Sequence, residues 1–130
     1  MPLLTTLDSD KTLKAVTASH PESGLTLKGY EIHHGYTAGN GVDPAMISAD
    51  GTAIGFASRD GLVMGTYLHG LFDNDAFRWW FIDRLRSRRD LAVLGDVRVK
   101  YDLEPALDRL ADIVRANLDV KQAYRLMGLK

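Results

Sequence analysis

The 130-residue sequence contains no cysteine. This absence excludes disulfides, thiolate metal ligands and a cysteine nucleophile within these residues. The formal net charge is −1, so the chain has no excess charge that would attract nucleic acid or an anionic membrane surface. It also lacks the apolar run of roughly 18 residues that a membrane span requires, and its first residues do not resemble a signal peptide. We therefore expect a cytoplasmic protein with no nucleic-acid partner and no membrane partner.

The first half of the chain has the patterns of β-structure. Residues 12–20 and 25–35 have the composition and alternation of strands. The alternation changes phase at Gly29, which predicts a bulge or a close backbone approach there. Residues 52–70 predict two strands joined by a tight turn at "RDG", whereas 36–51 contain many turn residues and predict a long irregular loop.

The second half has the patterns of helices. Aromatic and apolar residues recur at helical spacing over 77–85, and polar side chains at 73–75 can cap the start of this helix. A second helix is predicted at about 103–118, and a third begins at Asp119. The hydrophobic content is 45% and the charged content 25%, which is typical of a soluble globular domain or part of one. The sequence thus predicts an α/β fold.

Histidines are the candidate bases and metal ligands of the chain. His33 and His34 are adjacent, so they face opposite sides of a strand and do not chelate one metal together. No HxxxH or HExxH spacing is present. We therefore expect no metal site. The two other histidines are His20 and His69.

Glu31 and His33 are two residues apart on a predicted strand and so share one face. A carboxylate beside an imidazole can fix the tautomer and orientation of a base. The same spacing is also typical of a surface pair on a half-solvated strand, which is the more common arrangement. The local sequence leaves both interpretations open.

His69 lies in "GTYLHGLFDND" (65–75), where an apolar strand ends. Strand ends are positions from which α/β folds project functional side chains, and Gly70 permits unusual backbone angles directly after the histidine. Imidazole is suited to general base catalysis near neutral pH. The alternative is a core histidine that happens to precede a turn, and local sequence does not decide between the two.

Two segments together, "LKGYEIHHGYT" and "GLVMGTYLHGLFDNDAFR", resemble the cobyric acid synthase family, in the C-terminal part of its triad-type glutamine amidotransferase domain. The resemblance extends from about Leu3 to the last predicted helix. It implies an α/β fold that is the C-terminal portion of a class I glutamine amidotransferase-like (flavodoxin-like) domain, with β-hairpins followed by C-terminal helices. Residues 1–130 would then be a partial amidotransferase domain that lacks the upstream nucleophile-elbow half and the ATP-using synthetase domain.

The resemblance also implies an activity. The family hydrolyses glutamine with a cysteine nucleophile and a histidine base, and the ammonia amidates carboxylates of adenosylcobyrinic acid a,c-diamide in cobalamin biosynthesis. The parent family uses ATP and Mg²⁺, and we expect this segment itself to bind no cofactor. The expected partners are glutamine and the corrinoid through the complete enzyme, together with the upstream synthetase and nucleophile-bearing segments. The family's histidine falls on His69, and the Glu31–His33 segment is expected near the same pocket.

Two features depart from the family pattern. No cysteine is present, so this chain is expected to supply the base His69 without the nucleophile and to be inactive alone. Many triad amidotransferases carry a glutamate two residues after the histidine, where this chain has Leu71. Either Glu31 takes over as the orienting acid, supported by His33, or the site works as a cysteine–histidine pair.

Other identities fit the same residues. The chain could be a non-catalytic amidotransferase-like module that binds a partner or a tetrapyrrole. It could also be a fragment of a related amidotransferase, such as cobyrinic acid a,c-diamide synthase or a peptidoglycan-precursor amidase subunit. An exposed apolar face would favour the partial domain, because the missing half would cover it, whereas a closed core would favour the free-standing module.

Overall fold

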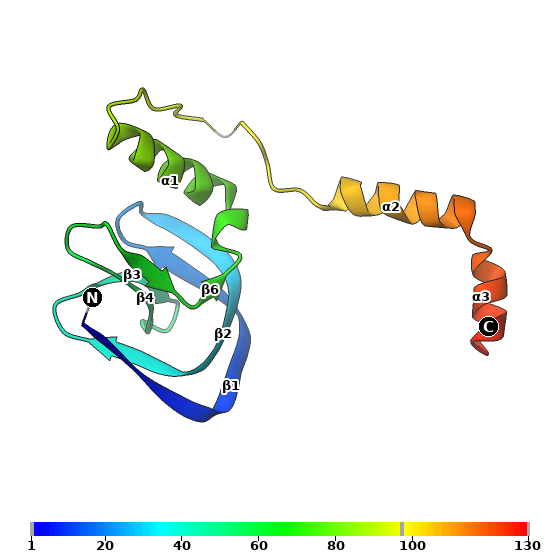
Figure 1. The fold of residues 1–130 in the computed structure, drawn as a ribbon, viewed down its shortest axis with the longest axis horizontal. Coiled ribbons are helices and arrows are strands. Elements are labelled where there is room, and N and C mark those ends of the chain that lie inside the picture. Colours follow the sequence, from blue (N-terminus) through cyan, green and yellow to red (C-terminus); the bar gives the residue numbers. More distant parts are fainter. Residues whose placement is uncertain (1, 97, 130) are drawn as a thin grey trace. The chain divides into compact units, whose positions relative to one another are not determined.

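The computed structural model describes residues 2–96 and 98–129 (Figure 1). The described residues up to Val99 form one compact unit, and those from Lys100 form a second. The first unit contains a six-stranded sheet and the helix α1, and the second contains α2 and α3. The predicted mixed α/β composition, with strands first and helices last, is confirmed. The strands are β1 (Leu3–His20), β2 (Leu25–Gly39), β3 (Asp43–Ser48), β4 (Ala53–Ala57), β5 (Met64–Thr66) and β6 (Leu68–His69).

The sheet has the strand order β5-β4-β3-β1-β2-β6. All five strand pairs in the described part of the chain are antiparallel. The two edge strands, β5 and β6, are separated in the chain only by Tyr67. The sheet therefore curls until its two edges meet at that residue, and the long β1 and β2 strands bend around the interior (Figure 1).

The prediction of an irregular loop over 36–51 is wrong. β2 continues to Gly39, and β3 lies inside the sheet between β1 and β4. Ala45 and Met46 of β3 are buried in the interior. Strand preference depends strongly on burial and on cross-strand neighbours, so pairing with distant strands outweighs the turn residues that surround this short segment.

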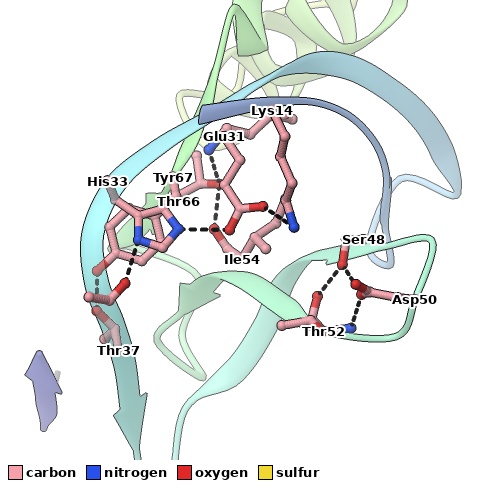
Figure 2. A network of polar contacts seen from close by, with 12 residues as sticks. Lys14, Glu31, His33, Thr37, Ser48, Asp50, Thr52, Ile54, Thr66 and Tyr67 are labelled. Atoms are coloured by element: carbon pink, nitrogen blue, oxygen red, sulfur yellow. Dashed lines mark hydrogen bonds and ion pairs between the residues drawn. The ribbon is translucent and has the colours of Figure 1, made fainter. Parts of the chain in front are cut away.

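Two turns of the sheet share the pattern Ser-x-Asp-Gly, at 48–51 and 58–61. In each, the aspartate accepts a hydrogen bond from the serine hydroxyl and another from the backbone N–H two residues further on. The glycines have φ of 87° and 63°, which glycine adopts without steric cost. In the first turn (Figure 2) the hydroxyl of Ser48 is the largest of the causes that lower the pKa of Asp50 to about 2. The second turn joins β4 to β5, as "RDG" predicted.

The hydrophobic core lies between the sheet and α1 (Asp75–Ser87). Phe77 of this helix is fully buried and contacts the rings of Phe72, Trp80 and Phe81. The sheet contributes Ala18, Leu27, Met46, Ile54 and Leu68 to the same core. Burial of these apolar side chains stabilises the first unit.

His20 is part of this core. It is 2% exposed, and its ring packs edge-on against Phe77 and Trp80. Burial lowers the pKa of His20; the carboxylate of Glu22 acts in the opposite direction, and the guanidinium of Arg84 lowers the pKa further. The folded protein therefore favours the neutral ring.

This burial predicts a pH dependence of stability. The pKa of His20 is 6.5 in the absence of the fold and lower in the folded state, so protonation favours unfolding. The stabilisation should be fully present above pH 6.5 and should decrease as the pH falls through the folded pKa. Urea unfolding from about pH 7.5 to about pH 5 measures it. His20→Gln should flatten the dependence, whereas His34→Gln, at an exposed histidine, should keep it. Equal slopes for the wild type and His20→Gln would contradict the assignment.

The second unit contains α2 (Glu104–Asn117) and α3 (Val120–Leu126). Asp119 caps α3 as predicted, because its side chain accepts a hydrogen bond of 2.9 Å from the backbone N–H of Gln122. No helix among the described residues has the length and apolar character of a membrane-spanning segment.

Candidate active site

His69 is the last residue of β6, at the edge of the sheet. It is paired with Tyr30 of β2. A Cβ atom at Gly29 would lie 2.1 Å from the backbone oxygen of His69, so the close backbone approach predicted at Gly29 is present. The backbone of His69 therefore lies tightly against β2, while its side chain is exposed.

The β2–β6 register separates two faces of the sheet. Directly opposite residues of an antiparallel pair share a face, so Tyr30 and His69 lie on one side and Glu31 and Leu68 on the other. Glu31 and Leu68 are 5% and 3% exposed and face the interior. We call their side the inner face, and the side of Tyr30 and His69 the outer face. Glu31 consequently faces away from His69.

A pocket of ≈ 360 Å³ lies close to His69. Its lining includes Lys28 and Tyr30 of β2 and Gly70 and Asp73 of the segment that follows His69, and His69 itself is not part of its lining. The position that often carries an orienting acid, Leu71, instead contributes to the buried core. The side chain of His69 is thus exposed near this pocket, and the position two residues later supplies no carboxylate.

Asn74 fixes the loop that follows His69. Its Oδ1 accepts a hydrogen bond of 2.9 Å from the backbone N–H of Lys28, and its Nδ2 donates to the backbone oxygens of Lys28 and Gly70 at 2.9 and 3.0 Å. Residues 73–75 predicted a helix cap, and Asn74 does occupy the cap position of α1, but its side chain makes no capping bond. Sequence reasoning missed this role because the contact with β2 joins residues 46 positions apart.

The structure brings Glu31 and His33 together on the inner face. Oε1 of Glu31 lies 2.7 Å from Nε2 of His33, and Oε2 lies 3.0 Å from Nζ of Lys14 (Figure 2). The hydrogen bond with Glu31 is the main cause that raises the pKa of Lys14. The other ring nitrogen of His33 contacts the backbone oxygen of Gly35. Both ring nitrogens of His33 therefore lie against oxygen atoms, one of a carboxylate and one of the backbone.

Tyr67 extends this group of contacts. Its ring stacks on His33 with 4.0 Å between the ring centroids, and its hydroxyl contacts that of Thr37 (Figure 2). We call Lys14, Glu31, His33, Thr37 and Tyr67 the inner polar cluster. No group of three or more potential ligands in the described residues is placed to hold a metal ion.

The comparisons with known proteins place these features in a class. Residues 1–77, which include His69 and the Glu31–His33 segment, match the family model of the CobB/CobQ-like glutamine amidotransferase domain. The chain belongs to this family of glutamine amidotransferase domains.

Its relatives are more specific, and the resemblance to cobyric acid synthases is confirmed. The chain is 48% identical to a cobyric acid synthase of Nitratidesulfovibrio vulgaris over 113 residues, which cover 84% of this chain and 21% of that protein. It is 40% identical to the adenosylcobalamin biosynthesis bifunctional protein CobDQ of Leptospira interrogans over 126 residues, or 96% of this chain and 15% of the relative. A cobyric acid synthase of Clostridium botulinum is 36% identical over 139 residues, or 100% of this chain and 28% of the relative.

The chain therefore spans between 15% and 28% of the length of these three relatives. No solved structure matches it significantly.

Proposed function

We propose that this chain is part of a glutamine-dependent amidotransferase of cobalamin biosynthesis and that His69 is its general base. The observation that carries the proposal is the presentation of His69. Its backbone lies against β2 at Gly29, and its exposed side chain shares the outer face with an open pocket. The match of residues 1–77 to an amidotransferase family supports glutamine as the substrate.

In this proposal a cysteine from another segment of polypeptide approaches His69 on the outer face. The imidazole takes the thiol proton, and the thiolate attacks the side-chain amide of glutamine. His69 returns the proton to the leaving ammonia, which leaves a thioester. Water then hydrolyses the thioester, releases glutamate and restores the thiol. Backbone N–H groups near the cysteine hold the oxyanion.

The proposed site works as a cysteine–histidine pair. Leu71 is buried, and Glu31 lies on the inner face with His33 and Lys14 as its partners. Neither residue therefore supplies a carboxylate to His69 on the outer face. This geometry supports the pair over the alternative in which Glu31 orients the base directly.

The released ammonia has a proposed destination outside this chain. We propose that it amidates carboxylates of adenosylcobyrinic acid a,c-diamide in a synthetase domain that consumes ATP and requires Mg²⁺. The names of the relatives, cobyric acid synthase among them, support this substrate class. This segment would bind neither ATP nor the metal.

The outer face supports a partial domain over a free-standing binding module. Leu13 and Tyr30 lie there and are 67% and 58% exposed. Within the described sheet, β6 is an edge strand and has β2 as its one neighbour. Exposed apolar groups and open edges of this kind favour coverage by further polypeptide. We propose that the nucleophile-bearing half of a flavodoxin-like domain covers this face and brings its cysteine to His69.

The test is reconstitution. The purified chain incubated with glutamine should release no more glutamate than its His69→Ala variant, because no thiol is present. Joining the chain to a cysteine-bearing amidotransferase half should produce glutaminase activity that His69→Ala abolishes. Turnover by the chain alone above the His69→Ala level would refute the proposal.

A further inference from the structure

We propose that Tyr67 is a positioning residue for His69, and that Glu31 and His33 act on the base through Tyr67 from the opposite face of the sheet. The inference rests on the proposed function of His69. It assigns the inner polar cluster a role that involves no contact with substrate.

Tyr67 joins the two edges of the curled sheet. Its backbone N–H donates a hydrogen bond of 2.8 Å to the oxygen of Ile54 in β4. Its side chain reaches β2, where the ring stacks on His33 and the hydroxyl contacts Thr37. One residue thus connects β4 on one side of the closure with β2 on the other (Figure 2).

The His33 ring, on which the Tyr67 ring stacks, is itself held in place. His33 is held at one ring nitrogen by Glu31 and at the other by the backbone oxygen of Gly35. Glu31 is buried and also binds Lys14. A ring that is hydrogen-bonded at both nitrogens is held in one orientation, so Tyr67 stacks on a ring with little freedom to turn.

His69 depends on this anchor because β6 is short. The strand has two residues and two pairs with β2. Tyr67 immediately precedes it, and the loop held by Asn74 follows it. Loss of the anchor before the strand would let β6 move against β2 while the core beneath remains. A misplacement of about 1 Å can reduce the rate of a catalysed step on the order of 100-fold.

The test uses the complete enzyme that contains this chain. Tyr67→Ala should lower kcat for glutamine hydrolysis on the order of 10- to 100-fold and leave KM for glutamine within about 2-fold, since a positioning defect acts on the chemical step. Amidation with added ammonium salt should be unchanged, because it bypasses the thiol and His69. Tyr67→Phe keeps the stacked ring and should restore most of the rate. Tyr124→Ala, at an exposed tyrosine of α3, should have no effect.

Glu31→Gln distinguishes two ways in which Glu31 can act on His69: through Tyr67, or by orienting the imidazole directly. If Glu31 acts through Tyr67, the Glu31→Gln variant should have a lower kcat, and the midpoint pH of its kcat/KM profile should be unchanged. Direct orientation of His69 by the carboxylate would shift that midpoint, and such a shift would overturn the inference. Equal losses of glutamine- and ammonia-dependent activity in Tyr67→Ala would also overturn it, because they indicate general unfolding. A wild-type kcat in Tyr67→Ala would likewise overturn the inference.

Different results would contradict the proposed function of His69 and the positioning role of Tyr67. If His69→Ala retains glutamine-dependent activity, the proposed function is wrong. If His69→Ala is inactive and Tyr67→Ala is fully active, only the positioning role is wrong. Amide exchange at Leu68 and His69 gives a structural readout on the chain itself, and both amides should exchange faster in Tyr67→Ala than in Tyr67→Phe.

Discussion

His69→Ala in the complete enzyme is expected to lower glutamine-dependent amidation by roughly 10²- to 10⁴-fold, the usual contribution of a positioned acid–base group. The methyl group neither accepts the thiol proton nor returns one to ammonia, so both halves of the hydrolysis are affected. Amidation with added ammonium salt should continue at the wild-type rate. Comparing the two nitrogen donors in one assay measures the effect.

The control for this prediction is another histidine in the same strand pair. His34 of β2 is exposed, and the register of β1 and β2 places it on the side of Ile32 and Tyr30. His34→Ala removes an imidazole from this face and should leave both nitrogen donors fully usable. Retained glutaminase activity in His69→Ala, or an equal loss in His34→Ala, would show that His69 is not the base.

Gly29→Ala is expected to disrupt the site without changing a catalytic side chain. The added Cβ would lie 2.1 Å from the backbone oxygen of His69 and 2.9 Å from Cδ1 of Leu68. Backbone atoms cannot yield as a flexible side chain does, so β6 has to move away from β2. Overpacking of this kind usually costs about 1–3 kcal/mol. We expect a loss of stability in urea unfolding and a large loss of glutamine-dependent activity.

Gly65→Ala is the matched control for Gly29→Ala. Gly65 lies in β5, and a Cβ there would meet no atom within 4 Å. This variant should unfold at nearly the wild-type urea concentration and keep its activity. If Gly29→Ala behaves in the same way, β2 does not fix the backbone of His69 and the account of its presentation fails.

The local patterns predicted the elements whose signals lie within a few residues. The helix at 103–118 appears as Glu104–Asn117 and the capped helix after Asp119 as Val120–Leu126, because helical periodicity and capping are local. The phase change at Gly29 also predicted a real backbone contact. β3 was missed because its turn-rich flanks hide a short strand that pairs with residues far away in the sequence.

For the candidate site, the residue types were predictable and their grouping was only partly so. Glu31 and His33 meet as their spacing on one strand suggested. The contacts of Tyr67 with His33 and Thr37, and those of Asn74 with β2, join residues between 30 and 46 positions apart, and no local pattern encodes such contacts. Asn74 in particular has the sequence features of a helix cap and serves mainly to fix a loop.

The sequence by itself determined that these residues contain no thiol, that a histidine ends a short apolar strand, and that glycine occupies a point where a bulge or a close backbone approach is expected. These are properties of composition and of neighbouring residues. Only the tertiary structure decided that His69 and Glu31 lie on opposite faces and that the sheet closes at Tyr67. The physical reason is that alternation assigns residues to faces within one strand, whereas the register between strands, set by long-range pairing, decides which faces coincide.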